Sequence, residues 1–200
     1  SAACAAEPAR IAAVSSADRL PELMRKALRR SFDGRPGVVH LDVPETIMNG
    51  SLPTTPPILP PHAYRTTAPA EPAAADIPRA ARLLLDAESP MIHAGSGVIH
   101  SGALEALRRV AERLHAPVTT SWAARGVLTE NSPLAIPMPH VELNHRVRNE
   151  SDGALIVGSR VGETDWWGRP PYWRDPARQR TVQVDVDGEP AGTVMVGARG

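Results

Sequence analysis

The chain has 200 residues, of which 42% are hydrophobic and 22% charged, and its formal net charge is zero. This profile is typical of a soluble globular protein that is long enough to bury a core. It gives no reason to expect nucleic acid or a membrane as a partner, and no apolar run approaches the ~20 residues of a membrane span. The single cysteine, Cys4, excludes an internal disulfide framework, and without a recognisable signal peptide we expect a cytoplasmic protein.

Residues 1–50 predict one helix and one strand. Apolar side chains recur at helical spacing over residues 20–28, and Pro21 falls in the first turn, where proline is tolerated. Residues 38–43 predict a short, mostly buried strand. Because one helix and one strand cannot enclose a core, we interpret this region as the C-terminal tail of a larger domain.

Residues 51–75 form a proline-rich segment, with seven prolines between Pro53 and Pro72. Proline fixes φ and removes a backbone donor, so the segment cannot sustain a helix or a central strand. We therefore expect an extended, semi-rigid linker between the first region and the rest of the chain.

Helical and strand patterns alternate over residues 76–200. Helices are predicted behind Asp76, behind a Ser101 cap and at residues 140–150. Strands are predicted at residues 91–94, 117–120, 154–157 and 181–186. This alternation predicts an α/β domain of the Rossmann-like class, with a parallel sheet and helices on both faces.

The clearest chemical signal is the turn Gly95-Ser96-Gly97, between a predicted strand and the next helix. Glycines let the backbone approach a ligand, and a helix start offers free N–H groups to a diphosphate. The dinucleotide fingerprint needs a third glycine, which falls two positions late at Gly102, so a nicotinamide cofactor is not indicated. The alternative is a tight turn that binds nothing.

Two other predicted strands end in polar groups. Ligands of open parallel sheets lie beyond the carboxyl ends of the strands, so Arg160 could meet an anion, and Asp185 and Asp187 could meet ribose hydroxyls. The alternatives are a surface arginine and carboxylates that cap a loop. No residue is assigned a catalytic or metal-binding role, and the candidate cofactor-binding residues are Gly95, Ser96, Gly97, Gly158, Ser159, Arg160 and Asp185.

Two further groups carry weaker signals. The spacing of His140, Glu142 and His145 does not match a zinc-protease motif, so we do not assign them to a metal. Four aromatic residues crowd one loop, and without a basic groove we interpret them as a buried contact surface rather than a platform for bases. They are Trp166, Trp167, Tyr172 and Trp173.

Several stretches, in order, resemble thiamine diphosphate-dependent enzymes such as acetolactate synthase. Residues 34–44, Gly-Arg-Pro-Gly-Val-Val-His-Leu-Asp-Val-Pro, resemble the segment that closes the pyrimidine-binding domain of that family. Residues 89–98, Ser-Pro-Met-Ile-His-Ala-Gly-Ser-Gly-Val, resemble the opening of its central domain. Four shorter stretches follow at the family's spacing, at residues 116–121, 132–134, 157–160 and 183–187.

The resemblance implies that residues 1–50 are the tail of the pyrimidine-binding domain, and that residues 76–200 are the central Rossmann-like domain. The implied parent is a carboligase or decarboxylase of 2-oxo acids, a transferase or lyase that uses thiamine diphosphate and magnesium. The family holds these groups through a Gly-Asp-Gly…Asn motif that the chain lacks, and its activating glutamate is expected before Ser1. We therefore expect an inactive chain whose partners are the parent's other domains and, in a homo-oligomer, further copies.

Some members of the family bind FAD or ADP in the central domain for structural reasons. Flavin-binding members carry Gly-Met-His-Gly where residues 138–143 read Met-Pro-His-Val-Glu-Leu, and Arg-Phe-Asp-Asp-Arg where residues 160–164 read Arg-Val-Gly-Glu-Thr. These departures argue against a flavin and leave room for a smaller nucleotide. Two alternatives to an enzyme part stay open: a free-standing Rossmann-type nucleotide-binding module, and a structural piece that mediates subunit packing.

Overall fold

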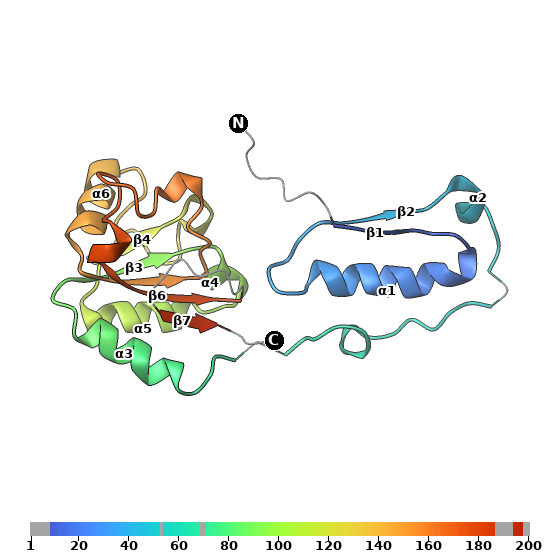
Figure 1. Ribbon diagram of the computed structural model, residues 1–200, viewed down its shortest axis with the longest axis horizontal. Coiled ribbons are helices and arrows are strands. Elements are labelled where there is room, and N and C mark those ends of the chain that lie inside the picture. The colour runs from blue at the N-terminus through green and yellow to red at the C-terminus, as the bar shows by residue number, and fades with distance from the viewer. Residues whose placement is uncertain (1–8, 53, 69–70, 187–193, 198–200) are drawn as a thin grey trace. The chain divides into compact units, whose positions relative to one another are not determined.

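The computed structural model describes residues 9–52, 54–68, 71–186 and 194–197, so that Cys4 and Asp187 lie outside the described residues. The chain divides into two compact units, Ser1–Pro69 and Ala70–Gly200 (Figure 1). The predicted limits at residues 50 and 75 lie on either side of this division. That the first unit is the tail of a larger domain stays a prediction.

The first unit is a β-α-β arrangement. Its elements are β1 (Ala9–Ala13), the 3-10 turn η1 (Ala17–Arg19), α1 (Leu20–Ser31), β2 (Val39–Asp42) and α2 (Glu45–Met48). The sequence predicts α1 and β2 but not β1, because an alanine-rich segment has low strand propensity. Pairing with β2 makes it a strand: the two run parallel, with Ala9 opposite Val39 and Ala13 opposite Asp42.

The apolar stripe of α1 is only partly covered. Leu23 and Ala27 are buried, whereas Met24 and Phe32 are 45% and 48% exposed. The prediction that β2 is mostly buried is wrong, since its residues are half-buried and His40 is exposed. The physical reason is that one helix and two strands, taken by themselves, shield little apolar surface.

The linker contains one 3-10 turn, η2 (Pro61–Ala63), and no longer helix or strand over its described residues up to 68. The Arg29 side chain donates to the Tyr64 carbonyl oxygen, and the Arg65 guanidinium lies 4.0 Å from the centre of the Phe32 ring. The second half of the linker is therefore held against the end of α1.

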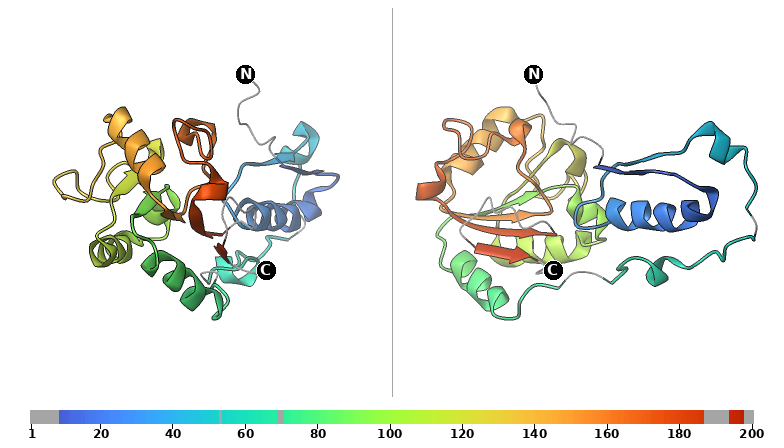
Figure 2. Two further views of the ribbon diagram at one scale, coloured as in Figure 1. Left: turned by 60° about the vertical axis from the view of Figure 1, so that its left-hand side comes forward. Right: turned by 45° about the vertical axis from the view of Figure 1, so that its right-hand side comes forward.

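The second unit is organised around five parallel strands in the order β4-β3-β5-β6-β7 (Figures 1 and 2). The structure confirms the predicted α/β class and the four predicted strands, and β7 is an addition. The strands are β3 (Pro90–Ala94), β4 (Val118–Thr120), β5 (Gly153–Val157), β6 (Arg180–Asp185) and β7 (Val194–Gly197).

Helices cover both faces of this sheet, as predicted. Figure 1 shows α3 and α5 on one face and α6 on the other. The helices are α3 (Asp76–Leu85), α4 (Gly97–His100), α5 (Leu104–Leu114) and α6 (Val141–Glu150), and the 3-10 turns are η3 (Trp122–Ala124), η4 (Glu163–Asp165) and η5 (Pro176–Arg178). The Ser101 cap is wrong, because the one-turn α4 intervenes and the Ser101 hydroxyl donates to the Val98 carbonyl oxygen at 3.2 Å.

Alternate residues of β3 face opposite layers. Ile92 and Ala94 join the apolar cluster formed with α3 and α5, whereas Met91 packs with Ile156 and Trp173 on the α6 side. All five are fully buried. A strand that is buried on both faces needs an almost continuous apolar run, which is why residues 91–94 stand out in the sequence.

Asp152 ties the amino ends of three strands together. Its Oδ1 accepts from the Ser89 N–H at 2.8 Å, and its Oδ2 accepts from the Glu88 N–H at 3.2 Å and from Arg180 Nη2 at 3.0 Å. Burial by itself would raise the pKa of this carboxyl, but the bonds from Ser89, Glu88 and Arg180 outweigh it and lower the pKa.

We expect Asp152→Ala to lower the free energy of unfolding by about 1–3 kcal/mol, because it removes the shared acceptor of three donors. Urea denaturation followed by circular dichroism measures the change. Asp86→Ala is the control, since it removes an exposed carboxylate from a neighbouring turn. Equal stability of the two variants would contradict the anchoring role of Asp152.

Candidate functional site

The turns that follow β3 and β5 contact each other directly. The Gly95 N–H donates to the Val157 carbonyl oxygen at 2.8 Å, and the Gly97 N–H donates to the Gly158 carbonyl oxygen at 3.0 Å. Because β3 and β5 are adjacent parallel strands, both turns lie at the carboxyl edge of the sheet. The structure thus joins two of the turns from which the sequence predicts ligand contacts.

Three glycines make this contact feasible. A Cβ on Gly95 would lie 2.2 Å from the Gly158 oxygen and 2.5 Å from the Ser159 Cα, and a Cβ on Gly97 would lie 2.7 Å from the Gly158 Cα. Gly158 also adopts a φ of +58°. The close packing of the two turns is therefore a structural reason for these glycines, and their predicted contact with a diphosphate stays a prediction.

The other candidate residues lie at the same edge. Ser159 is buried, and its Oγ accepts from the Val161 N–H at 3.1 Å. Ser96 and Asp185 are half-buried, and Arg160 is exposed. The edge thus gathers every candidate residue at the ends of three neighbouring strands, β3, β5 and β6. Their role in binding stays a prediction.

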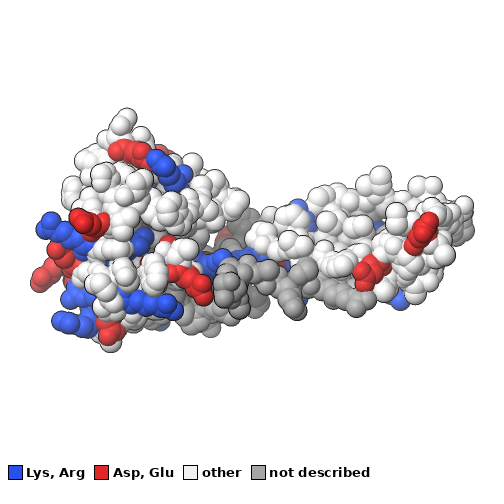
Figure 3. All heavy atoms as spheres, turned by 90° about the horizontal axis from the view of Figure 1, so that it is seen from above, with Lys and Arg blue, Asp and Glu red and all other residues white. Residues whose placement is uncertain are grey.

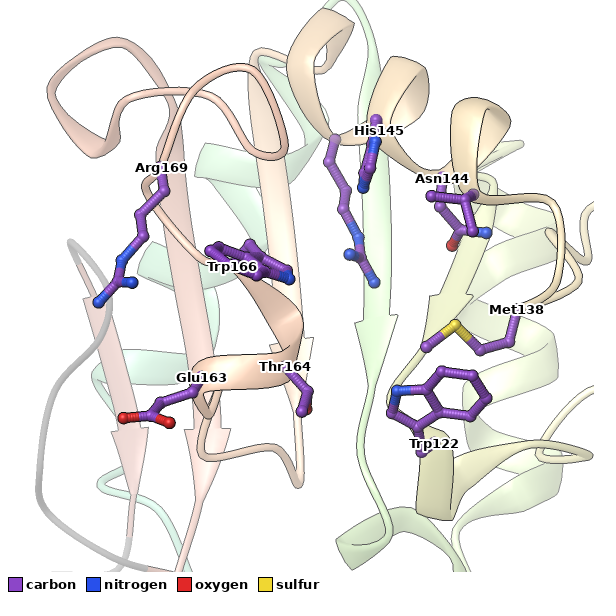
Figure 4. Close-up of a pocket in the computed structure, with 10 residues that line it drawn as sticks. Trp122, Met138, Asn144, His145, Glu163, Thr164, Trp166 and Arg169 are labelled. Atoms are coloured by element: carbon purple, nitrogen blue, oxygen red, sulfur yellow. The ribbon is translucent and has the colours of Figure 1, made fainter. Parts of the chain in front are cut away.

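A cleft of about 550 Å³ lies on the α6 side of the second unit (Figure 4). Figure 4 shows Trp122 and Met138 on one side of it and Trp166 on the other, with Asn144 and His145 extending from α6. The lining is completed by Val141, Arg148, Glu163, Thr164 and Arg169. Sequence reasoning missed this cleft, because its walls come from three segments that have no shared motif.

A buried polar network lies on the same face of the sheet. His93 Nδ1 is 3.0 Å from the Thr119 Oγ1, and His93 Nε2 is 3.6 Å from the Asp165 Oδ1. All three residues are buried, His93 and Thr119 completely. Burial lowers the pKa of His93 more than Asp165 raises it, so the imidazole is neutral at pH 7.

The hydroxyl, imidazole and carboxylate stand in the order of a nucleophile, its base and an orienting acid. Thr119 has no exposed surface, however, and its hydroxyl also contacts the Ile92 carbonyl oxygen at 3.4 Å. A substrate cannot reach this oxygen in the described structure, so the arrangement is not placed to perform catalysis, and His93 Nε2 and Asp165 Oδ1 are left without a hydrogen-bond partner.

Arg148 is buried beside this network and lines the cleft. Its Nη1 donates to the Asp165 carbonyl oxygen at 3.3 Å, and its guanidinium carbon lies 4.8 Å from the centre of the Trp173 ring. Burial lowers the pKa of this arginine, and the Asp165 charge partly opposes the shift. The guanidinium still stays protonated, because arginine is not deprotonated in proteins.

The aromatic residues predicted as one contact surface differ in burial, although the Trp166 and Tyr172 ring centres lie 4.8 Å apart. Trp173 is completely buried, and its Nε1 donates to the Gln179 Oε1 at 2.8 Å. Trp166 is 43% exposed and forms part of the cleft. One residue therefore covers the sheet while another is available to a ligand or a partner.

No group of three or more His, Cys, Asp or Glu side chains is placed to share a metal ion within the described part of the chain. Over the same residues, none of the helices has the length and apolar character needed to cross a membrane. Figure 3 shows acidic and basic side chains interspersed on the visible face of the second unit.

The parallel sheet, covered by helices on both faces and with polar groups at its carboxyl edge, defines a Rossmann-like domain. Residues 77–198 match the family described as thiamine pyrophosphate enzyme, central domain. The chain belongs to this family, and its second unit contains the family's central domain. This result does not favour the alternatives of a free-standing nucleotide-binding module or a packing piece.

Curated relatives carry the same family's names. The chain is 32% identical over 182 residues to a "probable acetolactate synthase large subunit" of Methanocaldococcus jannaschii, covering 87% of this chain and 30% of that protein. It is 33% identical over 154 residues to the acetolactate synthase large subunit of Corynebacterium glutamicum, covering 75% and 24%. A "probable 2-ketoarginine decarboxylase" of Pseudomonas aeruginosa is 32% identical over 178 residues, covering 86% and 29%.

A solved structure supports the fold independently. It is the X-ray structure of a protein assigned as a thiamin diphosphate-dependent enzyme from Mycobacterium smegmatis, with a TM-score of 0.71 and 22% identity. The similarity covers 94% of this chain and 36% of that one. The chain thus spans only about a quarter to a third of these proteins, from 24% of the Corynebacterium relative to 36% of this structure.

We expect Gly95→Ala to destabilise the second unit by about 3 kcal/mol or more, because the added Cβ would collide with backbone atoms of the facing turn. Gly162→Ala is the matched control, since its Cβ would meet its nearest atom, the Arg160 Nε, at 3.6 Å. Thermal unfolding of both variants tests this. A Gly95→Ala protein as stable as the control would contradict the packing role of the glycine.

Proposed function

We propose that the chain is part of a thiamine diphosphate-dependent carboligase or decarboxylase that acts on 2-oxo acids. The observation that supports this most directly is the match of residues 77–198 to the central domain of that enzyme family. The names of the relatives, acetolactate synthases and a 2-ketoarginine decarboxylase, favour an acetolactate synthase-like transferase or lyase.

The described residues do not fit a site for magnesium and a diphosphate. No cluster of metal-ligating side chains occurs among them, and the whole chain lacks a Gly-Asp-Gly sequence. In this proposal other parts of the parent protein hold thiamine diphosphate and magnesium, and the cofactor supplies the carbanion chemistry. The contribution of this chain is a rigid parallel sheet that connects and supports those parts.

The partners in this proposal are the remaining domains of the parent and further copies of the same protein. The interspersed surface charge and zero net charge favour protein partners over nucleic acid or a membrane. A cytoplasmic location suits a chain with a single cysteine.

The 200-residue chain, incubated with thiamine diphosphate, magnesium and pyruvate, is expected to consume no pyruvate above a control without protein. The reason is that the sequence contains no Gly-Asp-Gly motif and that the described residues hold no cluster of metal ligands. The protein encoded by the complete gene, assayed beside it, should consume a 2-oxo acid only when both cofactors are present. Turnover by the chain alone, or a complete protein inert toward a panel of 2-oxo acids, would contradict the proposal.

We further propose that any nucleotide in the central domain is ADP-like and lies outside the contact between the two glycine turns. The Gly97 N–H is already used by Gly158, and α4 has a single turn, so little of a helix start is available to a phosphate. Arg160 is an exposed cation at this edge, and an arginine can pair with a phosphate. FAD is disfavoured by the departures at residues 138–143 and 160–164.

Calorimetric titration with ADP is expected to show weak binding that Arg160→Ala reduces about tenfold, the effect of losing one charge-assisted bond. Arg178→Ala, which removes an exposed arginine before the amino end of β6, should leave binding unchanged. Undiminished affinity in Arg160→Ala would place the nucleotide elsewhere. Flavin absorbance near ~450 nm in the purified protein would overturn the exclusion of FAD.

A further inference from the structure

The cleft beside α6 has the size of a small-molecule site. Its volume of about 550 Å³ falls within the range of ligand pockets. Three large apolar side chains that line the cleft are exposed: Trp122 by 65%, Val141 by 55% and Trp166 by 43%. Two exposed indoles on facing sides of one cleft suit a flat, apolar ligand that can lie between them (Figure 4).

Arg148 adds a charge to this apolar cleft. It is only 3% exposed, and its Nε and Nη2 atoms have no hydrogen-bond partner in the described structure. The Nη1 atom is occupied by the Asp165 carbonyl oxygen. Nε–H and Nη2–H share one edge of the guanidinium, which is an edge that binds the two oxygens of a carboxylate in parallel. A buried cation with this edge unpaired is stabilised by an anion that reaches it.

The surroundings of Arg148 favour a singly charged ligand over a phosphate. Glu163 lines the same cleft, and the charge of the buried Asp165 carboxylate acts on the Arg148 guanidinium, partly opposing the effect of burial on the pKa of this arginine. One carboxylate at the cleft and one whose charge acts on the arginine would repel a dianion more strongly than a monoanion. Asn144 contributes an oxygen, Oδ1, that is also unpartnered and could accept from a ligand N–H or O–H.

We propose that this cleft binds a flat aromatic monocarboxylate, with the carboxylate on the Nε and Nη2 edge of Arg148 and the ring between Trp122 and Trp166. Both nitrogens are covered in the free protein, so one wall has to shift when the ligand enters. The wall at Glu163–Arg169 suits this movement, because its regular structure is limited to the single 3-10 turn η4, and Trp166 holds a φ of 55°.

The site is separate in its residues from the strand-end residues proposed for a nucleotide, and it does not rest on that proposal. None of the cleft residues is a strand-end candidate, but Met138, Val141, Glu163 and Thr164 fall within residues 138–143 and 160–164, where flavin-binding members of the family carry their motifs. A failure of ADP to bind, or an Arg160→Ala variant without effect, therefore says nothing about the cleft. The two sites are distinguished by Arg160→Ala and Arg148→Met.

The test is a titration of the whole chain with 2-naphthoate and with its neutral isostere 2-naphthamide, followed through the indole N–H signals in ¹H–¹⁵N NMR spectra. The naphthoate is expected to bind at least about tenfold more tightly, and to shift the signals of Trp122 and Trp166. Equal affinity for the two compounds, shifts confined to other tryptophans, or no binding of either at millimolar concentration would overturn the proposal.

Variants test whether Arg148 is responsible for the preference for naphthoate over naphthamide. Arg148→Met should bring naphthoate down to the affinity of naphthamide, and Arg148→Lys should lose most of the preference, because an ammonium lacks the two-point edge. Arg146→Met, on the same helix and exposed, is the control that should bind as the unaltered chain does. Trp122→Ala, at a largely exposed site, should weaken both compounds alike. A preference that survives in a folded Arg148 variant, or affinities unchanged in Trp122→Ala, would refute the assignment.

Discussion

The carboxyl ends of β3 and β5 are joined by backbone hydrogen bonds between the turns that follow them. Gly97 donates to the Gly158 oxygen at 3.0 Å, and the missing Cβ atoms at Gly95 and Gly97 allow two turns to occupy space that side chains would otherwise fill. The chain leaves this contact through Val161, a β-branched residue at a φ of 45°, which is an uncommon and strained conformation. The Ser159 hydroxyl, which accepts from the Val161 N–H, helps to hold it there.

After Val161 the chain crosses the α6 face of the sheet. Several buried residues on this face are polar, and they meet polar groups of the crossing segment. Thr119, His93 and Gln183 lie in one row across the strands. In the strand pairing, His93 is opposite Thr119 on one side and Ile156 on the other, and Ile156 is opposite Gln183. Buried polar groups need partners. Asp165 comes from the crossing segment to lie beside His93, and Gln183 donates to the Ser159 carbonyl oxygen at 3.2 Å.

The two faces therefore have different properties within one domain of the thiamine pyrophosphate enzyme family. The face under α3 and α5 is an apolar cluster, which gives the domain its rigidity. The face under α6 keeps unpartnered atoms on Arg148 and Asn144 beside an open cleft. The well-packed apolar layer suits a connecting role in a larger enzyme. On the other face, polar atoms without hydrogen-bond partners lie beside a cleft, and a ligand that enters the cleft can supply those partners.

The sequence alone was enough to predict α1, α3, β3 and the parallel α/β class, because apolar spacing at a period of 3.6 and short buried runs are local patterns. Local pattern could not reveal β1, whose alanine-rich segment becomes a strand only by pairing with β2. It placed Gly95 and Gly158 correctly at strand ends, but it could not reveal that the two turns pack against each other, because that contact joins residues far apart in the chain. No sequence pattern around Arg148 marks it as special. Only the tertiary structure buries its guanidinium and leaves two of its nitrogens without hydrogen-bond partners, because both properties depend on segments that come together from distant parts of the chain.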